Sequence, residues 1–150
     1  MRGIQLIHIK IPKTKDDFKI YYDLRYKVLR EPWGQPRGTE KDDYEPISHH
    51  FMAVNDQDKE VVGCVKFFEK EPGVAWVSHL AVKSALQRTG IGRQLLGYVE
   101  AQARELGYKK IGCQSRLNTT DYFEKAGYKV HGLPTRYFGT TQVVWMEKEL

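Results

Sequence analysis

The 150-residue sequence contains no apolar run that approaches the roughly 20 residues of a membrane-spanning helix. The N-terminal stretch from Ile4 to Ile11 is interrupted by polar side chains, so it lacks the unbroken apolar region of a signal peptide. Its two cysteines, Cys64 and Cys113, lie in separate apolar runs with no second potential ligand near either of them. The number and placement of the cysteines exclude a zinc site of known ligand spacing and a disulfide framework. We therefore expect a cytoplasmic protein with no metal and no membrane partner.

The charge balance says little about binding partners. Lys and Arg number 24 against 19 Asp and Glu, which gives a formal charge of +5, and the basic residues are scattered along the chain. Nucleic-acid-binding proteins usually gather their basic residues on one face, so we expect no nucleic acid partner. Hydrophobic residues make up 41% of the sequence, which is typical of folded proteins. Because a chain of this length usually forms one domain, we predict a single domain over residues 1–150.

Proline, glycine and hydrophobic periodicity divide the sequence into alternating strands and helices. Strands are expected at residues 4–11, 50–54, 61–68, 75–82, 110–113 and 143–147, with one more shortly before 143, and helices at 14–29, 91–106 and 119–125. Thr14 and Asp17 resemble a capping box, and Asn118 is the expected N-cap of the last helix. The order predicts the α+β (mixed α/β) class, with a mixed, mostly antiparallel sheet of about six or seven strands and helices on both faces.

The segment that carries chemistry is the strand-to-helix connection at residues 80–93. Gly90 and Gly92 stand at the start of an amphipathic helix, where unpaired N–H groups and the helix dipole favour an anion. Arg88 and Arg93 add positive charge at the same place. The pattern therefore indicates either a phosphate-binding loop or a plain turn that precedes a helix.

Two well-known phosphate-binding loops are excluded by spacing. A dinucleotide fingerprint would need a third glycine at the position of Leu95. A nucleotide P-loop would need Lys and Ser or Thr where Tyr98 and Val99 stand. A phosphate loop at this place must be of another kind.

The remaining pattern, Gln87-Arg88-x-Gly90-x-Gly92 after a strand that ends in Leu80-Ala81-Val82, resembles the pyrophosphate-binding motif of the GNAT superfamily of N-acetyltransferases. Residues 122–128, Tyr-Phe-Glu-Lys-Ala-Gly-Tyr, are similar to the family's Phe-Tyr-Glu-Lys-x-Gly-Phe segment, and so is the ending at residues 146–148. The order of elements resembles the GNAT fold over nearly the whole chain. The resemblance therefore implies that fold, with strands that splay apart at the cofactor site.

The resemblance also implies an activity. The implied activity is acetyl-CoA-dependent N-acetyl transfer. An acetyl group would pass to a primary amine of a small molecule or protein by direct attack in a ternary complex. The alternative is a non-catalytic acyl-CoA-binding sensor or partner-binding module. No metal is implied, and a homodimer is compatible with the family.

Carried over position by position, the resemblance implies a set of cofactor-binding residues. They are Leu80, Ala81, Val82, Gln87, Arg88, Thr89, Gly90, Ile91, Gly92, Arg93, Asn118 and Phe123. The backbone N–H of Leu80 would also bind the thioester carbonyl and stabilise the oxyanion that forms during attack.

The general acid and base are less well specified. The family's acidic Tyr aligns with Phe123, and Tyr122 stands one residue earlier, about 100° away around the helix. Tyr122 is therefore either a displaced general acid or a packing residue. His79, next to Leu80, is either the general base or an ordinary strand histidine, since Trp76 occupies the position where some members carry a catalytic Glu.

Residues 31–48 are expected to form a long loop with one short helix. The resemblance implies that the amine acceptor binds at this loop, beside the first helix. Trp33 and Tyr44 in this loop, together with Arg25 on the preceding helix, are the candidate substrate-binding residues. Aromatic rings beside carboxylates suit a cationic amine. The alternatives are a charged surface loop and, for Arg25, a buried ion pair.

Overall fold

A computed structural model of the chain describes residues 6–136 and 141–150, and it divides the chain into two compact units. Unit 1 consists of Met1–Phe68 and His79–Val99, and unit 2 consists of Glu69–Ser78 and Glu100–Leu150. Ile4, the start of the expected first strand, lies outside the described residues. The single domain remains a prediction, and each unit is described by itself.

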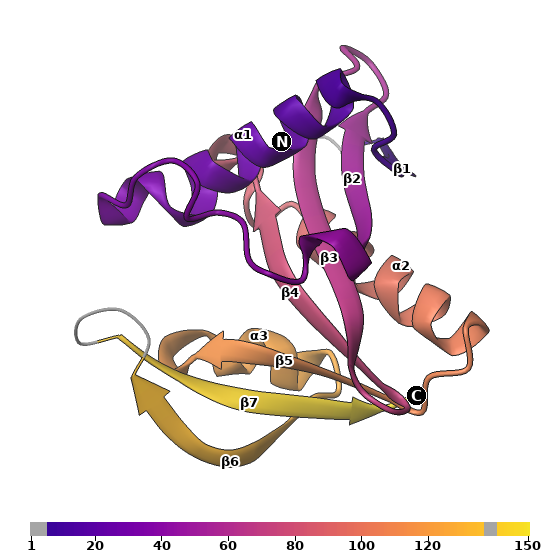
Figure 1. Ribbon diagram of the computed structural model, residues 1–150, viewed down its shortest axis with the longest axis vertical. Coiled ribbons are helices and arrows are strands. Elements are labelled where there is room, and N and C mark those ends of the chain that lie inside the picture. The colour runs from indigo at the N-terminus through magenta and orange to yellow at the C-terminus, as the bar shows by residue number, and fades with distance from the viewer. Residues whose placement is uncertain (1–5, 137–140) are drawn as a thin grey trace. The chain divides into compact units, whose positions relative to one another are not determined.

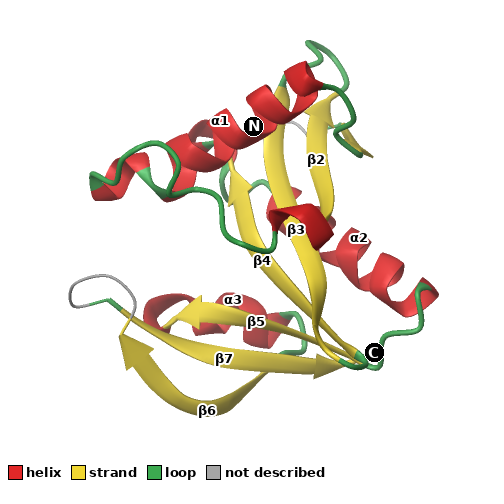
Figure 2. Ribbon diagram, viewed as in Figure 1, coloured by secondary structure: helices red, strands yellow, loops and turns green. Residues whose placement is uncertain are grey.

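The described residues form the strands and helices that the periodicity predicts, with several longer strands (Figures 1 and 2). The strands are β1 (Ile7–Lys10), β2 (His49–Asn55), β3 (Val61–Glu71), β4 (Val74–Val82), β5 (Lys110–Arg116), β6 (Lys129–Arg136) and β7 (Gln142–Glu149). The α-helices are α1 (Lys15–Leu29), α2 (Ile91–Glu105) and α3 (Thr120–Lys125). Short 3-10 helices are η1 (Glu31–Trp33), η2 (Glu45–Ile47), η3 (Ser84–Leu86) and η4 (Leu117–Thr119).

The strands follow the order β1-β2-β3-β4-β5-β7-β6 in a seven-stranded sheet. The pairs β1–β2, β2–β3, β5–β7 and β6–β7 are antiparallel, whereas β4 and β5 are parallel. The parallel ladder joins Val74–Trp76 to Lys110–Gly112, and both strands continue past it. The prediction of a mixed, mostly antiparallel sheet is confirmed.

Helix α1 covers one face of the strands of unit 1 (Figure 1). The predicted capping box is present, because the Thr14 side chain accepts the Asp17 N–H and the Asp17 carboxylate accepts the Thr14 N–H. Tyr21, at the centre of the helix, is fully buried. It packs in one core cluster with Met52, Val54, Cys64 and Ala81.

Helix α2 covers the opposite face of the same strands. A Cβ added to Gly63 would lie 2.9 Å from the Leu95 side chain, so β3 and α2 approach each other closely at this glycine. Phe51 of β2 also meets Tyr98 of α2 edge to face, with ring centroids 5.2 Å apart. Within unit 1, the prediction of helices on both faces is therefore confirmed.

The loop at residues 31–48 differs from the expectation of one short helix. It contains two, η1 and η2, and each begins with the dipeptide Glu-Pro. Proline is favoured at the first positions of a helix, because an N–H at these positions would have no hydrogen-bond partner within the helix and proline has none to leave unpaired. Both helices can be explained by these prolines.

Unit 2 is built on β5, β7 and β6, with β4 starting beside β5. Trp76 and Trp145 meet edge to face with ring centroids 5.0 Å apart. A Cβ at Gly112 would lie 2.9 Å from Trp145 Nε1 and 3.1 Å from Trp76. Gly112 is therefore what allows both indoles to pack against β5.

One local prediction in unit 2 is wrong. Asn118 lies inside η4 and is not the N-cap of α3; the N-cap is Thr119, which makes no side-chain capping hydrogen bond. The chain already turns at Leu117, so the helix begins after a 3-10 turn and leaves Asn118 upstream of the capping position.

None of the helices among residues 6–136 and 141–150 is long and apolar enough to cross a bilayer.

Candidate active site

The end of β4 has an unusual backbone. His79 adopts φ 55°, in the left-handed region that residues other than glycine rarely occupy. Its carbonyl accepts a hydrogen bond from Cys64 Sγ at 3.6 Å. The next three residues, Leu80–Val82, complete the strand. Strain of this kind is concentrated at functional sites, and here it falls at the position where the sequence predicts the thioester.

The turn that follows is held in shape by its own side chains. Gln87 Nε2 donates to the Val82 carbonyl at 3.1 Å, and Thr89 Oγ1 donates to the Leu86 carbonyl at 2.5 Å. Arg88 and Gly90 have φ values of 67° and 93°. These bonds bring the predicted cofactor residues 80–82 and 87–93 into one strand–turn–helix segment.

Helix α2 starts directly after this turn. The Gln94 N–H makes the first bond of the helix, to the Gly90 carbonyl at 3.0 Å. The amides of Ile91 and Gly92 therefore precede the helical hydrogen-bond pattern, as at any helix start. A Cβ at Gly90 would meet nothing within 4 Å, so the backbone can be approached closely there. Arg88 is exposed beside it. This combination suits a phosphate group.

A network of buried charges lies on the α1 face of β3. Arg25 is fully buried, and its Nη1 donates to Glu45 Oε1 at 2.9 Å and to the Glu40 carbonyl at 3.0 Å. Lys66 is also fully buried, and its Nζ donates to Glu45 Oε2 at 2.8 Å and to Asp42 Oδ1 at 2.5 Å. Two cations and two carboxylates therefore balance each other inside unit 1.

The network includes the tyrosines of α1. Tyr22 OH donates to Glu45 Oε1 at 3.1 Å, and Arg25 Nη2 donates to Tyr21 OH at 2.7 Å. Tyr21 OH also lies 2.7 Å from His50 Nδ1. Arg25 is thus the buried ion pair that the sequence left open as an alternative, and its full burial argues against direct contact with a substrate.

The network reaches the end of β4 through Asp42. Asp42 Oδ2 lies 4.0 Å from His79 Nδ1, and the Asp42 side chain is 33% exposed. His79 is 11% exposed. The structure therefore brings together one predicted catalytic residue and a carboxylate from the loop.

These surroundings shift the titration of the network. Burial works to raise the pKa of the Glu45 carboxyl, but Arg25 and Lys66 outweigh it and hold that pKa well below its usual range. Burial, together with the charges of Arg25 and Lys66, lowers the pKa of His79 to about 2. Burial also lowers the pKa of His50. Both imidazoles are therefore neutral at neutral pH.

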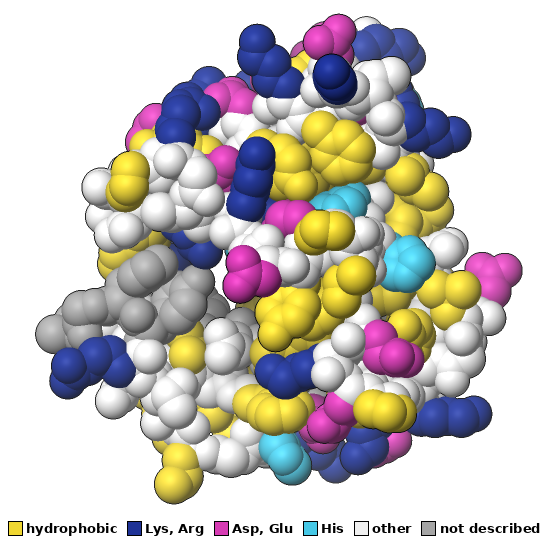
Figure 3. Space-filling view, viewed as in Figure 1, with side chains coloured by type: hydrophobic (Ala, Val, Ile, Leu, Met, Phe, Trp, Pro, Cys, Tyr) yellow, Lys and Arg dark blue, Asp and Glu magenta, His cyan; other side chains and the backbone are white. Residues whose placement is uncertain are grey.

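The predicted aromatic residues of the loop lie at the surface. Tyr44 is 49% exposed, and its ring stacks on Phe68 with centroids 4.3 Å apart. Its N–H donates to Asp42 Oδ1 at 2.9 Å. Trp33 is 41% exposed, in η1. Figure 3 shows carboxylate and histidine side chains among hydrophobic ones around η2 and β2.

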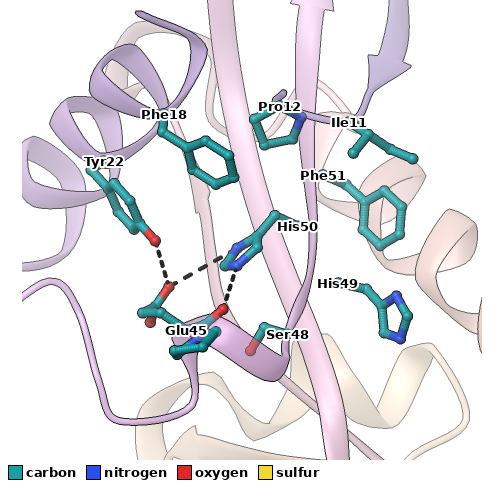
Figure 4. Close-up of a pocket in the computed structure, with 10 residues that line it drawn as sticks. Ile11, Pro12, Phe18, Tyr22, Glu45, Ser48, His49, His50 and Phe51 are labelled. Carbon is teal, nitrogen blue, oxygen red and sulfur yellow. Dashed lines mark hydrogen bonds and ion pairs between the residues drawn. The ribbon is translucent and has the colours of Figure 1, made fainter. Parts of the chain in front are cut away.

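A cavity of about 630 Å³ opens beside the network in unit 1, between α1, η2 and β2 (Figure 4). Tyr22, Glu45 and His50 form its polar side, and His50 Nε2 lies 2.9 Å from the Glu45 carbonyl. None of the predicted cofactor residues lines it. Its lining residues are Ile11, Pro12, Phe18, Tyr22, Glu45, Pro46, Ser48, His49, His50 and Phe51.

The remaining predicted site residues belong to unit 2. Tyr122 and Phe123 are half-buried in α3 and meet edge to face, with ring centroids 5.1 Å apart. Phe123 also packs against Tyr128 at 5.7 Å. Trp76 is buried against Trp145. The roles of Tyr122, Phe123 and Asn118 toward a ligand remain predictions.

Sequence reasoning missed Asp42, Glu45 and Lys66 as members of one site. The available signal was Lys66, a single charge inside the apolar strand Val61–Phe68. A buried lysine requires a partner of opposite charge. The sequence does not say which of the acidic residues provides it. Among residues 6–136 and 141–150, no group of three or more His, Cys, Asp and Glu is arranged to hold a metal ion.

Comparison with known proteins gives a family match. The model of the acetyltransferase (GNAT) family matches residues 18–128, which include most of α1, the buried network and the strand–turn–helix segment. This range is more than half of the chain.

Solved structures show the same fold. A crystal structure from Lactobacillus plantarum, described provisionally as an N-acetyltransferase, superposes with a TM-score of 0.86 over 96% of this chain and 98% of that one, at 23% identity. An aminoglycoside 6'-N-acetyltransferase in complex with coenzyme A superposes with a TM-score of 0.78 over 96% of each chain, at 18% identity. At these identities, the likeness concerns the fold.

A curated relative is similar over part of the chain. The tRNA(Met) cytidine acetyltransferase TmcA of Aeropyrum pernix is 42% identical over 66 residues. That match covers 43% of this chain and 9% of the length of TmcA.

Proposed function

We propose, from the premise that the chain belongs to the GNAT acetyltransferase family, that it transfers an acetyl group from acetyl-CoA to a primary amine. The observation that carries the proposal is the strand–turn–helix segment at residues 80–93. Its left-handed Arg88 and Gly90 and its open helix start suit a phosphate-binding turn, and the left-handed His79 precedes the end of β4, where the thioester is expected. A relative of the same fold is known in complex with coenzyme A.

In this proposal, the main chain of the turn binds the cofactor. Amides from Arg88 to Arg93 hold the pyrophosphate, and Gln87 supports the turn through its bond to the Val82 carbonyl. Backbone groups of Leu80 and Val82 bind the pantetheine arm, with Ala81 buried below them. The Leu80 N–H stabilises negative charge on the thioester oxygen.

The transfer is a direct attack within a ternary complex. The ammonium first loses a proton, and the amine lone pair then forms a C–N bond with the thioester carbonyl carbon. The C–S bond breaks, and the thiolate takes up the second proton that the nitrogen releases. The products are an amide, the free thiol of coenzyme A and one proton. Positioning of the amine supplies most of the required acceleration.

His79 is the proposed group that receives the first proton. The imidazole is neutral at neutral pH and so has an unprotonated nitrogen, but burial and the charges of Arg25 and Lys66 lower its pKa to about 2 and make it a weak base; water is the alternative acceptor of this proton. Tyr122 remains the candidate acid for the thiolate, although water can supply that proton.

The experiment that tests the proposal measures release of free thiol from acetyl-CoA. The panel of acceptors comprises polyamines, amino acids, aminoglycosides, peptides with free N-termini, cytidine and tRNA; the last two follow from the similarity to TmcA. We expect thiol release with at least one amine and acetylated product by mass spectrometry. Binding of coenzyme A without thiol release for any acceptor would favour the alternative, a non-catalytic acyl-CoA-binding module.

A further inference from the structure

The loop that faces the end of β4 is acidic on a basic protein. Residues 40–45 include four carboxylates, Glu40, Asp42, Asp43 and Glu45, and one lysine, whereas the whole chain carries a charge of +5. The acidic character of residues 40–45 is therefore local and opposite in sign to the net charge of the chain.

The four carboxylates differ in how far they are buried and in the groups that they contact. Glu40 is buried and accepts the Gly38 N–H at 2.7 Å. Glu45 is 11% exposed and is occupied by Arg25, Lys66 and Tyr22. Asp43 is exposed at the surface. Asp42 is partly exposed and also belongs to the network, so it joins the interior to the surface.

The two oxygens of Asp42 have different surroundings. Oδ1 accepts from Lys66 Nζ and from the Tyr44 N–H. Oδ2 lies 4.0 Å from His79 Nδ1, which is too far for a direct hydrogen bond. A nitrogen atom placed between these two atoms can be about 2.9 Å from both, which is the ordinary hydrogen-bond distance. An amine there would lie beside the residue that precedes Leu80.

The surface next to Asp42 is aromatic. Tyr44 has one ring face stacked on Phe68 and is 49% exposed. An exposed aromatic ring beside a carboxylate favours a cation that also carries apolar surface.

We propose that Asp42 binds the amine acceptor, with its Oδ2 and His79 Nδ1 holding the reacting nitrogen and the Tyr44 ring packing against the rest of the molecule. The acceptor is accordingly a primary amine that is cationic in solution. Lys66 is a positioning residue, because its ammonium fixes Asp42 Oδ1 and leaves Oδ2 directed at His79. This assignment rests on the proposed function and specifies the substrate class of the same site.

The test uses the most active cationic amine of the acceptor panel. In Asp42→Asn, we expect KM for that amine to rise at least tenfold, because the variant loses the anion that holds the ammonium. Affinity for coenzyme A, measured by calorimetry, should not change. Lys66 keeps Glu45 at 2.8 Å, so we expect the variant to fold. Asp43→Asn is the matched control, with the same change of charge one residue away, and should leave KM unchanged.

Ionic strength separates a charge contact from a structural effect. Raising the ionic strength from about 0.01 M to about 0.15 M shortens the screening length from about 30 Å to about 8 Å. KM of the wild type should rise over this range, and KM of Asp42→Asn should change little. Asp42→Glu retains a partner for Lys66 and should give an intermediate KM. Tyr44→Ala should raise KM by a smaller factor.

Two results would overturn the assignment in a wild type that is active. One is the same KM in Asp42→Asn and Asp43→Asn. The other is turnover with neutral amines, such as that of cytidine, and none with cationic amines. Failure of the proposed function appears separately, as an absence of thiol release from the wild type with every acceptor.

Discussion

The two halves of the candidate site in unit 1 are built in different ways. The cofactor segment at residues 80–93 is contiguous, and its main chain provides the binding groups. The network of Arg25, Asp42, Glu45 and Lys66 is assembled from side chains of α1, the loop and β3. Changes of exposed side chains in the first should therefore affect binding with little effect on folding. Changes in the second should affect both.

The largest effect is expected where the network loses an anion. Glu45→Gln leaves Arg25 and Lys66 with less compensation, and loss of one partner of a buried ion pair costs about 3–5 kcal/mol. Urea unfolding followed by circular dichroism measures this loss. Asp43→Asn, at the surface, should stay within about 0.5 kcal/mol of the wild type. If Glu45→Gln lowered the unfolding free energy by less than about 1 kcal/mol, as for an exposed ion pair, the buried network would not have the structural role proposed for it.

The second effect is a dependence of stability on pH. The folded-state pKa values of His79 and His50 lie below the usual 6.5. Below that pH, the unfolded chain binds protons that the folded chain does not, so the free energy of unfolding falls as pH decreases. Each histidine contributes up to about 1.4 kcal/mol per pH unit. Glu45 adds to the loss below its unfolded pKa of 4.5, because its folded pKa is also lowered.

His79→Asn isolates one contribution, since asparagine tolerates the left-handed backbone. We expect its unfolding free energy to fall less steeply than that of the wild type between about pH 6.5 and pH 4.5, by up to about 1.4 kcal/mol per pH unit. Equal slopes in the two proteins would show that the His79 imidazole titrates normally.

The third effect is on the cofactor half. Arg88→Glu places an anion next to the proposed pyrophosphate, and we expect affinity for coenzyme A to fall at least tenfold, or about 1.4 kcal/mol. Arginine and glutamate are both non-glycine residues, so we expect the left-handed backbone at position 88 to carry the same strain in both proteins. Arg104→Glu, an exposed residue in the last turn of α2, makes the same reversal of charge and should bind normally. Isothermal titration calorimetry of all three proteins would reject the phosphate role if Arg88→Glu bound as the wild type does.

The last effect concerns backbone conformation. Gly90→Ala forces alanine to φ 93°, which costs about 1–2 kcal/mol, and the space around it is open, so no clash contributes. Gly97→Ala is the matched change in the interior of α2, where nothing lies within 4 Å of the new Cβ. It should stabilise by about 0.5–1 kcal/mol because alanine favours helices. Thermal unfolding measures the two shifts, and the same sign for both would refute the conformational argument.

The contrast also explains what the sequence could predict. The cofactor segment was predictable because its residues are consecutive and glycine marks the backbone positions that matter. The strands were predictable from apolar runs bounded by proline, glycine and other turn residues, and the mixed sheet from the order of strands and helices. Asp42 and Lys66 lie 24 residues apart, and Arg25 and Glu45 lie 20 apart, and neither pair has a local pattern. Their pairing depends on how the loop folds against β3.

Local errors have local causes. Asn118 satisfied the residue preference of an N-cap, but the 3-10 turn at Leu117–Thr119 moved the start of α3 by one residue. The second Glu-Pro pair of the loop, at residues 45–46, was present in the sequence and indicates the second short helix.

The buried thiols have a practical consequence. Cys64 lies in unit 1 and Cys113 in unit 2, and burial raises their pKa values to about 11 and about 12. Because the thiolate is the reactive form, neither side chain competes with released coenzyme A for a disulfide dye. Each becomes accessible when its own strand opens. The alkylation rates of Cys64 and Cys113 in the folded wild-type protein, followed separately by peptide mapping, would therefore report the opening of β3 and of β5 independently.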